Sequence, residues 1–227
     1  MTNHGNRRQR RRSASPLRSD IVDTLGILGL GILGLACLSQ KSTEPGPSPT
    51  PRYLGIPTDI FDFAAAAQEQ DMWCWAASVQ MLLKYYGIQQ SQEQIVARAY
   101  GHPFNEPGTD EAISASLHGW GIKADHKRFI VQSRVIAGPP TPHVLFRELS
   151  SGRPILLTFS PGFAVGHAVV VTAASAVNRQ IISLVYRDPG PTPSNLENRG
   201  RIELSFGDLA SFLPSIRSHW LVSVREE

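Results

Sequence analysis

The feature that most constrains the fold is the order of the secondary-structure patterns along the chain. Between about residues 71 and 150, apolar residues recur with helical spacing, as at Trp75, Val79 and Leu82. After residue 153, short runs rich in Val, Ile and Leu alternate with turn residues and predict strands at Pro154–Phe159, His167–Thr172, Ile181–Tyr186 and Leu221–Val224. A helical block followed by an antiparallel meander predicts an α+β domain.

Capping residues set the expected ends of the helices. Hydrogen-bonding side chains stand before each apolar segment and predict N-caps at Asp71, Ser91, Thr109 and Thr141. Ser91 and Gln94 have the spacing of a capping box, and Thr141 precedes a proline in the first turn. Between two strands, Asn178–Arg179 predicts a hairpin turn.

The positive net charge of +3 comes from the first 20 residues. This arm holds six arginines and one acidic residue, Asp20, so the rest of the chain has 16 basic and 18 acidic side chains. Proteins that follow nucleic-acid grooves carry their basic residues on the folded domain. We therefore expect no nucleic-acid partner.

An uncharged apolar run, Thr24–Leu38, follows the arginines. It is shorter than the roughly 20 residues that span a bilayer and has the length of a signal-peptide core. We therefore expect the protein to be exported, either to the cell envelope or out of the cell. The alternatives are lipidation at Cys37, a membrane tether through residues 24–38, or a cytoplasmic chain if the run is no signal.

The expected domain organisation has three parts. Residues 1–40 form the basic arm and the signal or anchor, residues 41–57 have the Pro-rich composition of a linker, and residues 58–227 form the folded domain. Cleavage at or before Cys37 leaves Cys74 as a single thiol, which in an exported protein is a candidate for reactivity.

Cys74 lies in the first turn of a predicted helix, where unpaired backbone N–H groups and the helix dipole favour a thiolate. His167 opens one predicted strand, and Asp188 follows the next strand of the same hairpin. Cys74, His167 and Asp188 therefore fit the roles of nucleophile, base and orienting carboxylate in a catalytic triad. Taken singly, each residue also fits a structural role: a buried thiol, a core histidine and a turn aspartate.

Gln68 precedes Cys74 by six residues, and its amide could join the Cys74 backbone N–H in binding an oxyanion. Gln70 is the nearer alternative, and a solvated polar side chain is an equally open interpretation. The remaining histidines have no zinc-site spacing, and the chain has no Gly-rich phosphate loop, so we expect neither a metal nor a cofactor.

Several segments resemble those of bacterial papain-like cysteine peptidases, namely QEQDMWCWAASVQMLLKYYG, SQEQI, SGRPILLTFS, GHAVVVTA and YRDPG. The similar group includes the leader-cleaving peptidase domains of bacteriocin exporters and certain plant-pathogen effector proteases. The resemblance extends from about Ile56 to Val224. It implies a papain-like fold, in which a helical subdomain with the nucleophile at a helix N-terminus packs on an antiparallel sheet that carries the histidine and the aspartate.

The resemblance also implies roles: Cys74 as nucleophile, His167 as general base, Asp188 as its orienter and Gln68 in the oxyanion hole. The sequence departs from the leader-cleaving domains at Cys74–Trp75, where those domains usually have Cys-Gly. We also expect no fused transporter. The implied activity is hydrolysis of a protein or peptide substrate through a thioester, by a monomer. The alternatives are a related acyltransferase or amidase, transglutaminase-like or directed at peptidoglycan, and a non-catalytic binding module.

Loops at about residues 101–110 and 160–166 are expected to shape the substrate pocket. Four aromatic residues surround the predicted Cys74 helix, at Trp73, Trp75, Tyr85 and Tyr86. They are expected mainly in the core, with cleft lining as the alternative.

Overall fold

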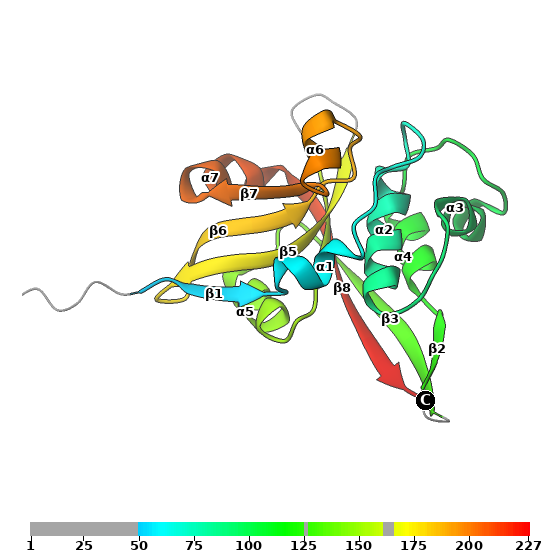
Figure 1. Cartoon of the computed structure of the whole chain (residues 1–227), viewed down its shortest axis with the longest axis horizontal. Helices are drawn as coiled ribbons and strands as arrows, with labels where there is room; N and C mark the ends of the chain where they lie inside the picture. The colour runs from blue at the N-terminus through cyan, green and yellow to red at the C-terminus, as the bar shows by residue number, and fades with distance from the viewer. Residues whose placement is uncertain (1–49, 125–126, 161–165) are drawn as a thin grey trace, which may run out of the picture. The chain divides into compact units, whose positions relative to one another are not determined.

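The computed structural model describes residues 50–124, 127–160 and 166–227 (Figure 1). The basic arm, the apolar run and the linker up to residue 49 lie outside the described residues, so the predictions about them stay predictions. The helices are α1 (Thr58–Asp62), α2 (Cys74–Tyr85), α3 (Gln92–Tyr100), α4 (Asp110–Leu117), α5 (Pro142–Ser150), α6 (Pro193–Glu197) and α7 (Phe206–Ser215).

All the described strands join one antiparallel sheet, in which seven follow the order β2-β3-β8-β4-β5-β6-β7 and β1 pairs with β5. Their bounds are β1 (Arg52–Gly55), β2 (Gly121–Ala124), β3 (Lys127–Ala137), β4 (Ile155–Phe159), β5 (His167–Val177), β6 (Gln180–Arg187), β7 (Arg201–Ser205) and β8 (Ile216–Glu226). The sheet and the helices confirm the predicted α+β class.

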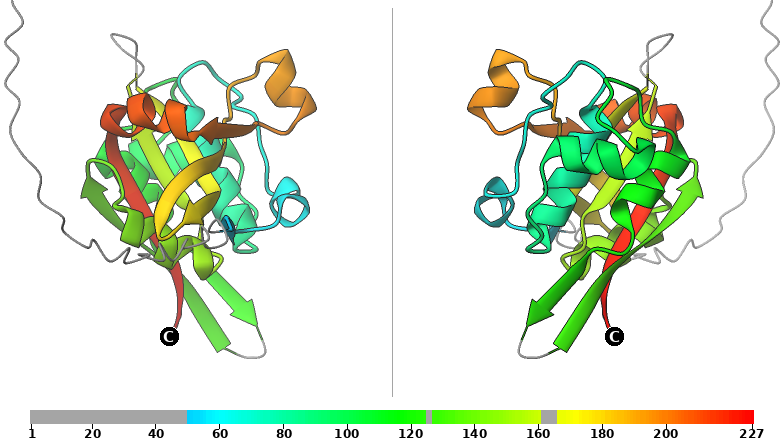
Figure 2. Two further views of the ribbon diagram at one scale, coloured as in Figure 1. Left: turned by 90° about the vertical axis from the view of Figure 1, so that its left-hand side faces the viewer. Right: turned by 90° about the vertical axis from the view of Figure 1, so that its right-hand side faces the viewer.

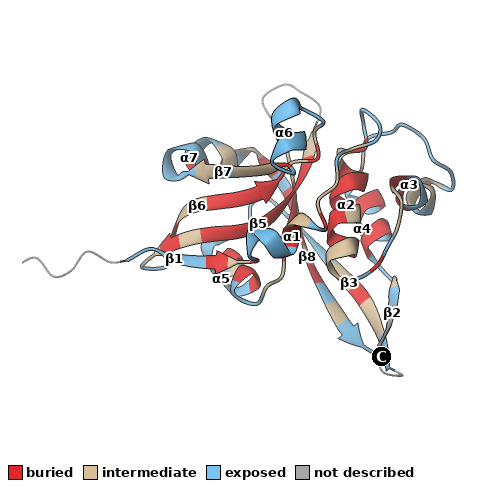
Figure 3. Ribbon diagram, in the orientation of Figure 1, coloured by how far each residue is buried: buried red, intermediate tan, exposed pale blue. Residues whose placement is uncertain are grey.

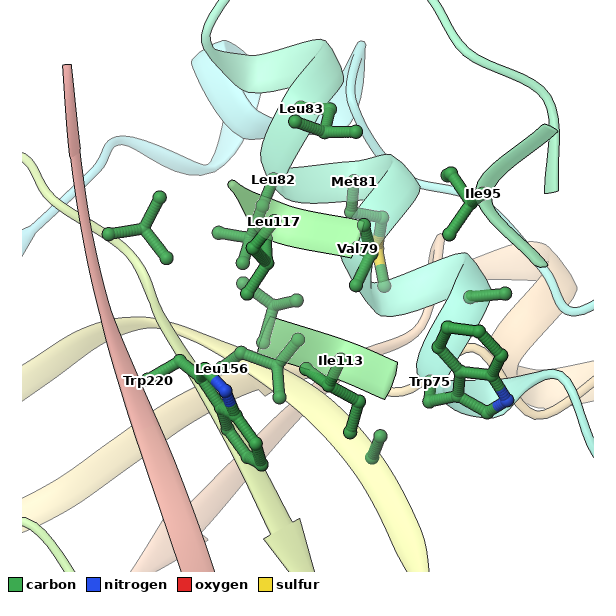
Figure 4. Packing of buried hydrophobic residues seen from close by; sticks show 14 of the residues in the cluster. Trp75, Val79, Met81, Leu82, Leu83, Ile95, Ile113, Leu117, Leu156 and Trp220 are labelled. Carbon is green, nitrogen blue, oxygen red and sulfur yellow. The ribbon is translucent and has the colours of Figure 1, made fainter. Parts of the chain in front are cut away.

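Both faces of the central strands are covered, as the unbroken burial of Ala168–Ala174 in β5 shows (Figure 3). Side chains alternate between the faces of a strand, so Leu156 and Val170 belong to the cluster on the side of α2 and α4, whereas Leu157 and Val169 pack on the side of α5 and α7. Figure 4 shows how the first cluster meets, with the sheet residues Leu156 and Trp220 facing the helix residues Trp75, Val79, Leu82, Ile113 and Leu117.

Local capping signals place most helix ends. The Ser91–Gln94 capping box is present, and the hydroxyls of Thr109 and Thr141 accept the N–H groups of the first turns of α4 and α5. Asn178 and Arg179 both have positive φ and form the predicted hairpin turn between β5 and β6. These predictions are confirmed because each depends on neighbours within a few residues.

Three expectations need correction. Asp71 does not cap α2, whose N-cap position is Trp73 without a side-chain hydrogen bond. The sheet is not a simple meander, because β8 lies between β3 and β4, and the β2–β3 hairpin runs beside β8 (Figures 1 and 2). The predicted linker over residues 41–57 also contains a strand, since β1 pairs with β5 from Arg52 to Gly55.

The position of β1 has a simple physical reason. β4 pairs with β5 only as far as Val171, and β1 continues along the same edge by pairing with Ala173–Ala176. Without β1, this edge of a buried strand would leave backbone groups unpaired. Within the three described stretches of chain, no helix has the length and apolar character needed to cross a bilayer.

Candidate active site

Cys74 is the first residue of α2, and the next turns of that helix hold it against the core through buried residues such as Trp75 and Val79. The first N–H groups of a helix have no partner within the helix, and no side chain caps this one. The Cys74 thiol is half-buried and forms no disulfide. It therefore lies where backbone dipoles favour negative charge.

His167 and Asp188 come from adjacent strands of the β5–β6 hairpin. The pairing of Val170 with Arg187 brings the start of β5 beside the end of β6. The His167 Nε2 atom lies 2.7 Å from Asp188 Oδ1, within hydrogen-bond distance. With Nε2 engaged by the carboxylate, Nδ1 is the ring nitrogen left for the thiol.

The charge on His167 is set by competing effects. Burial alone would lower its pKa, but hydrogen bonds to Asp188 and to the Cys74 side chain, with the charges of both groups, raise the pKa to about 10. His167 is thus an imidazolium at neutral pH. Cys74 and His167 line the same cleft, and Asp188 is hydrogen-bonded to His167, so the structure brings together three of the predicted site residues.

Asp188 is held by its own loop. Burial raises the pKa of its carboxyl, but His167, the Gly190 N–H and Asn195 outweigh that effect, so the pKa lies below its ordinary value. The Gly190 N–H donates to Asp188 Oδ1 at 2.8 Å, and the Asp188 N–H donates to the carbonyl of Gly200 at 2.7 Å. Sequence reasoning did not single out Asn195 or Gly200, because neither role leaves a local pattern.

A cleft of about 880 Å³ opens beside these groups. Its lining comes from the α2 N-terminus, the start of α4, the ends of β4 and β5, and β8, and includes Gln68, Cys74, Trp75, Pro107, Gly108, Asp110, Thr158, His167, Pro191 and Arg217. Of the two loops expected to shape the pocket, Pro107–Asp110 and Gly166 line it. Residues 161–165 of the second loop lie outside the described residues.

Trp73 and Trp75 fix one wall of the cleft. Their indole N–H groups donate to the carbonyls of Phe104 and Glu106, at 2.7 Å and 3.0 Å. A Cβ at Gly108 would overlap the Trp75 ring, so this loop packs directly on α2. Trp73 and Trp75 are both buried, which confirms their expected place in the core, and Trp75 also lines the cleft.

Gln68 lines the cleft with Cys74, and Gln70, the alternative, is not among the lining residues. The Gln68 amide does not point its N–H groups freely into the cleft, because Nε2 donates to the carbonyls of Gln70 and Asp71 at 3.0 Å and 2.9 Å. The Gln68 backbone N–H donates to Pro189, which joins this segment to the loop of Asp188.

The described residues contain no group of three or more His, Cys, Asp or Glu side chains that could hold a metal ion. His219, a histidine outside the cleft, is buried and hydrogen-bonded through Nδ1 to the carbonyl of Gly138. Burial is the main cause that lowers its pKa, so it stays neutral. The groups at this cleft are a thiol at a helix N-terminus, an imidazolium and the carboxylate that is hydrogen-bonded to it.

Two solved structures of peptidase domains are similar to this chain. One similar solved structure is the peptidase domain of Streptococcus ComA, a bi-functional ABC transporter involved in a quorum-sensing pathway, with 16% identity and a TM-score of 0.49 over 70% of this chain and 96% of that one. Another is a double-glycine-motif protease from an AMS/PCAT transporter in complex with its leader peptide, with 13% identity and a TM-score of 0.46 over 70% and 89%.

No curated protein sequence matches the chain. The family model that does match is described as the Peptidase_C39 like family, and it covers residues 60–204. That range is more than half of the chain and includes Gln68, Cys74, His167 and Asp188. The chain belongs to the Peptidase_C39 like family.

Proposed function

We propose that this chain is an active cysteine peptidase, with Cys74 as nucleophile, His167 as general base and acid, and Asp188 as the orienting residue. The observation that carries the proposal is the placement of His167, which lines one cleft with Cys74 while its Nε2 lies 2.7 Å from Asp188 Oδ1. A non-catalytic member of the family would have no need to keep Cys74 and the hydrogen-bonded His167–Asp188 pair together at one cleft.

In the proposed reaction, the Cys74 thiolate attacks the carbonyl carbon of a peptide bond. The C–N bond then breaks, and the amine leaves with the proton that His167 donates. The acyl group remains on sulfur as a thioester. Water, deprotonated by the neutral His167, attacks this thioester. The thiolate leaves, and the new carboxylic acid is released and loses its proton to solvent. Asp188 holds the ring with Nε2 toward the carboxylate throughout, so that Nδ1 faces the reacting atoms.

The oxyanion of the tetrahedral intermediate would form next to the Cys74 backbone N–H, at the positive end of α2. We propose Gln68 as the second donor. Since its amide donates to the carbonyls of Gln70 and Asp71, a substrate must take the place of one of them. Gln68→Ala should therefore lower kcat by about 100-fold to 1,000-fold and leave the folded fraction unchanged.

The proposed peptidase activity is tested with pooled peptides and mass spectrometry on the full chain. Cys74→Ala and His167→Ala should each abolish cleavage while the circular-dichroism spectrum stays the same. His143→Ala, which changes an exposed histidine outside the cleft, is the matched control and should keep full activity. Cleavage that survives Cys74→Ala or His167→Ala refutes the assignment.

The variant Asp188→Asn tests whether Asp188 only orients the His167 ring, without taking part in bond making. It should reduce turnover less than loss of Cys74 or His167, because asparagine keeps a hydrogen-bond acceptor near Nε2 but loses the charge. An equal loss in all three variants would mean that Asp188 also supports the fold. Transfer of the acyl group to an added amine, in place of hydrolysis, would assign the chain to the acyltransferases instead.

We also propose export, because an arginine-rich arm followed by the apolar run Thr24–Leu38 is typical of a signal segment. Fractionation of cells that express the full chain, with N-terminal sequencing of the mature product, tests this. Recovery of the intact chain in the cytoplasm alone would contradict it.

A further inference from the structure

One wall of the cleft carries an arginine that the proposed triad does not use. Arg217 belongs to β8, is exposed, and lines the cleft with His167 and Thr158. Its Nη1 atom lies 4.0 Å from the position of a Cβ on Gly166, the chain neighbour of His167. The guanidinium therefore lies close to the residue that precedes His167, on the cleft that Cys74 and His167 also line.

A β-bulge gives Arg217 this position. Thr158 of β4 pairs with Ser218, but the next residue, Phe159, pairs with Ile216, so Arg217 is the extra residue between them. In a regular strand, Arg217 and Ser218 would point to opposite faces. A bulge redirects side chains and is common beside active sites.

Ser218 shows the result of this redirection on the neighbouring position. Its hydroxyl donates to Asp110 Oδ2 at 2.6 Å, and Asp110 lines the same cleft as Arg217. Two consecutive residues of β8 thus contribute to one cleft. Arg217 lines it directly, and Ser218 holds the carboxylate of Asp110, which also lines it, by a hydrogen bond.

The charge of Arg217 is available to a ligand. Over residues 50–124, 127–160 and 166–227, its guanidinium lies within 4.0 Å of no carboxylate. Asp110, by contrast, already accepts a hydrogen bond from Ser218. A guanidinium keeps its charge at every working pH and binds a carboxylate through two parallel hydrogen bonds.

We propose that Arg217 is a specificity residue that binds an acidic side chain of the substrate, within two residues of the bond that Cys74 attacks. This inference rests on the proposed peptidase function and adds a substrate class to it, namely peptides with Asp or Glu beside the scissile bond. Arg217 acts in binding and takes no part in bond making.

The test uses the full chain and pools of random hexapeptides, each pool with one position fixed as Glu, Gln or Lys. The wild type should cleave the Glu pool at least about 10-fold faster than the Lys pool at one position, the size expected of one charge-assisted hydrogen-bonded pair that is partly solvated. Arg217→Gln should remove this preference and Arg217→Glu should reverse it. Arg225→Gln, an exposed arginine of the same strand that does not line the cleft, is the matched control.

A Glu preference that persists in Arg217→Gln overturns the inference, and so does a Lys preference in the wild type, which would make Asp110 the dominant charge. If the wild type cleaves no pool, the proposed function fails instead. In that case, fluorescence anisotropy of the same pools, labelled and bound to the wild type, still tests the inference. Tighter binding of Glu pools that disappears in Arg217→Glu supports it, and equal binding of Glu and Lys pools contradicts it.

Discussion

Gly200 supports Asp188 by close backbone contact, and adding a single methyl group there tests that contact. Gly200 has φ of 72°, and its carbonyl accepts the Asp188 N–H at 2.7 Å. A Cβ on Gly200 would overlap the Asp188 carbonyl oxygen and lie 3.1 Å from the nitrogen and carbonyl carbon of Asp188. Gly200→Ala therefore combines a left-handed conformation with a steric overlap that only backbone movement can relieve.

The control variant, Gly101→Ala, separates the cost of the left-handed conformation from the cost of the steric overlap. Gly101 has φ of 84° and nothing within 4 Å of a built Cβ, so Gly101→Ala has the conformational cost alone. The left-handed conformation costs about 1–2 kcal/mol and overpacking about 1–3 kcal/mol more. Gly101→Ala should thus lose about 1–2 kcal/mol of unfolding free energy, and Gly200→Ala about 2–5 kcal/mol.

Urea unfolding measures both variants, and NMR titration of the His167 ring reports on the site. Movement of Asp188 should lower the pKa of His167 in Gly200→Ala and leave it unchanged in Gly101→Ala. If both variants lose the same stability and both keep the His167 titration, then the backbone contact with Asp188 is not as close as the structure places it.

Two further predictions concern charge. The pKa of His167 in the folded protein is raised from 6.5 to about 10, so its interaction with Asp188 contributes its full stability below about pH 6.5 and loses it as the pH rises through 10. The unfolding free energies of wild type and Asp188→Asn should therefore converge in that window, and a difference that stays constant from pH 6 to 11 contradicts the linkage. Asp62→Asn leaves the buried guanidinium of Arg187, 2.7 Å from Asp62, without its carboxylate. Urea unfolding should show a loss of about 2–4 kcal/mol, against less than about 0.5 kcal/mol for Glu203→Gln in an exposed pair; equal losses would refute a special role for Asp62.

Local patterns in the sequence predict those parts of the fold that depend on local interactions. The capping box at Ser91, the threonine cap at Thr141 and the turn at Asn178 each involve partners a few residues away, and the structure has all three. Pairing between distant strands is different. The insertion of β8 between β3 and β4 leaves no mark on any one strand, since an antiparallel neighbour can come from anywhere in the chain.

The residues of the candidate site also differ in whether local sequence patterns predict their positions. His167 and Asp188 occupy one hairpin, so their proximity follows from the strand pattern and its turn. Cys74 is far from both in sequence, so no local pattern brings it beside them, and only its chemistry and the family resemblance suggest that the three residues act together. Arg217 could not be found from the sequence, because its position depends on a one-residue change of register between β4 and β8.

The central claim is that Cys74 and His167 form a thiolate–imidazolium pair. Its most direct test is the pH dependence of Cys74 alkylation by iodoacetamide in the full chain, with mass spectrometry of the Cys74 peptide to exclude signal from Cys37. Alkylation should stay fast well below pH 8 in the wild type, and this low-pH reactivity should disappear in His167→Ala. An unchanged profile in His167→Ala, with Cys74 reacting as an ordinary thiol in both proteins, would contradict the claim.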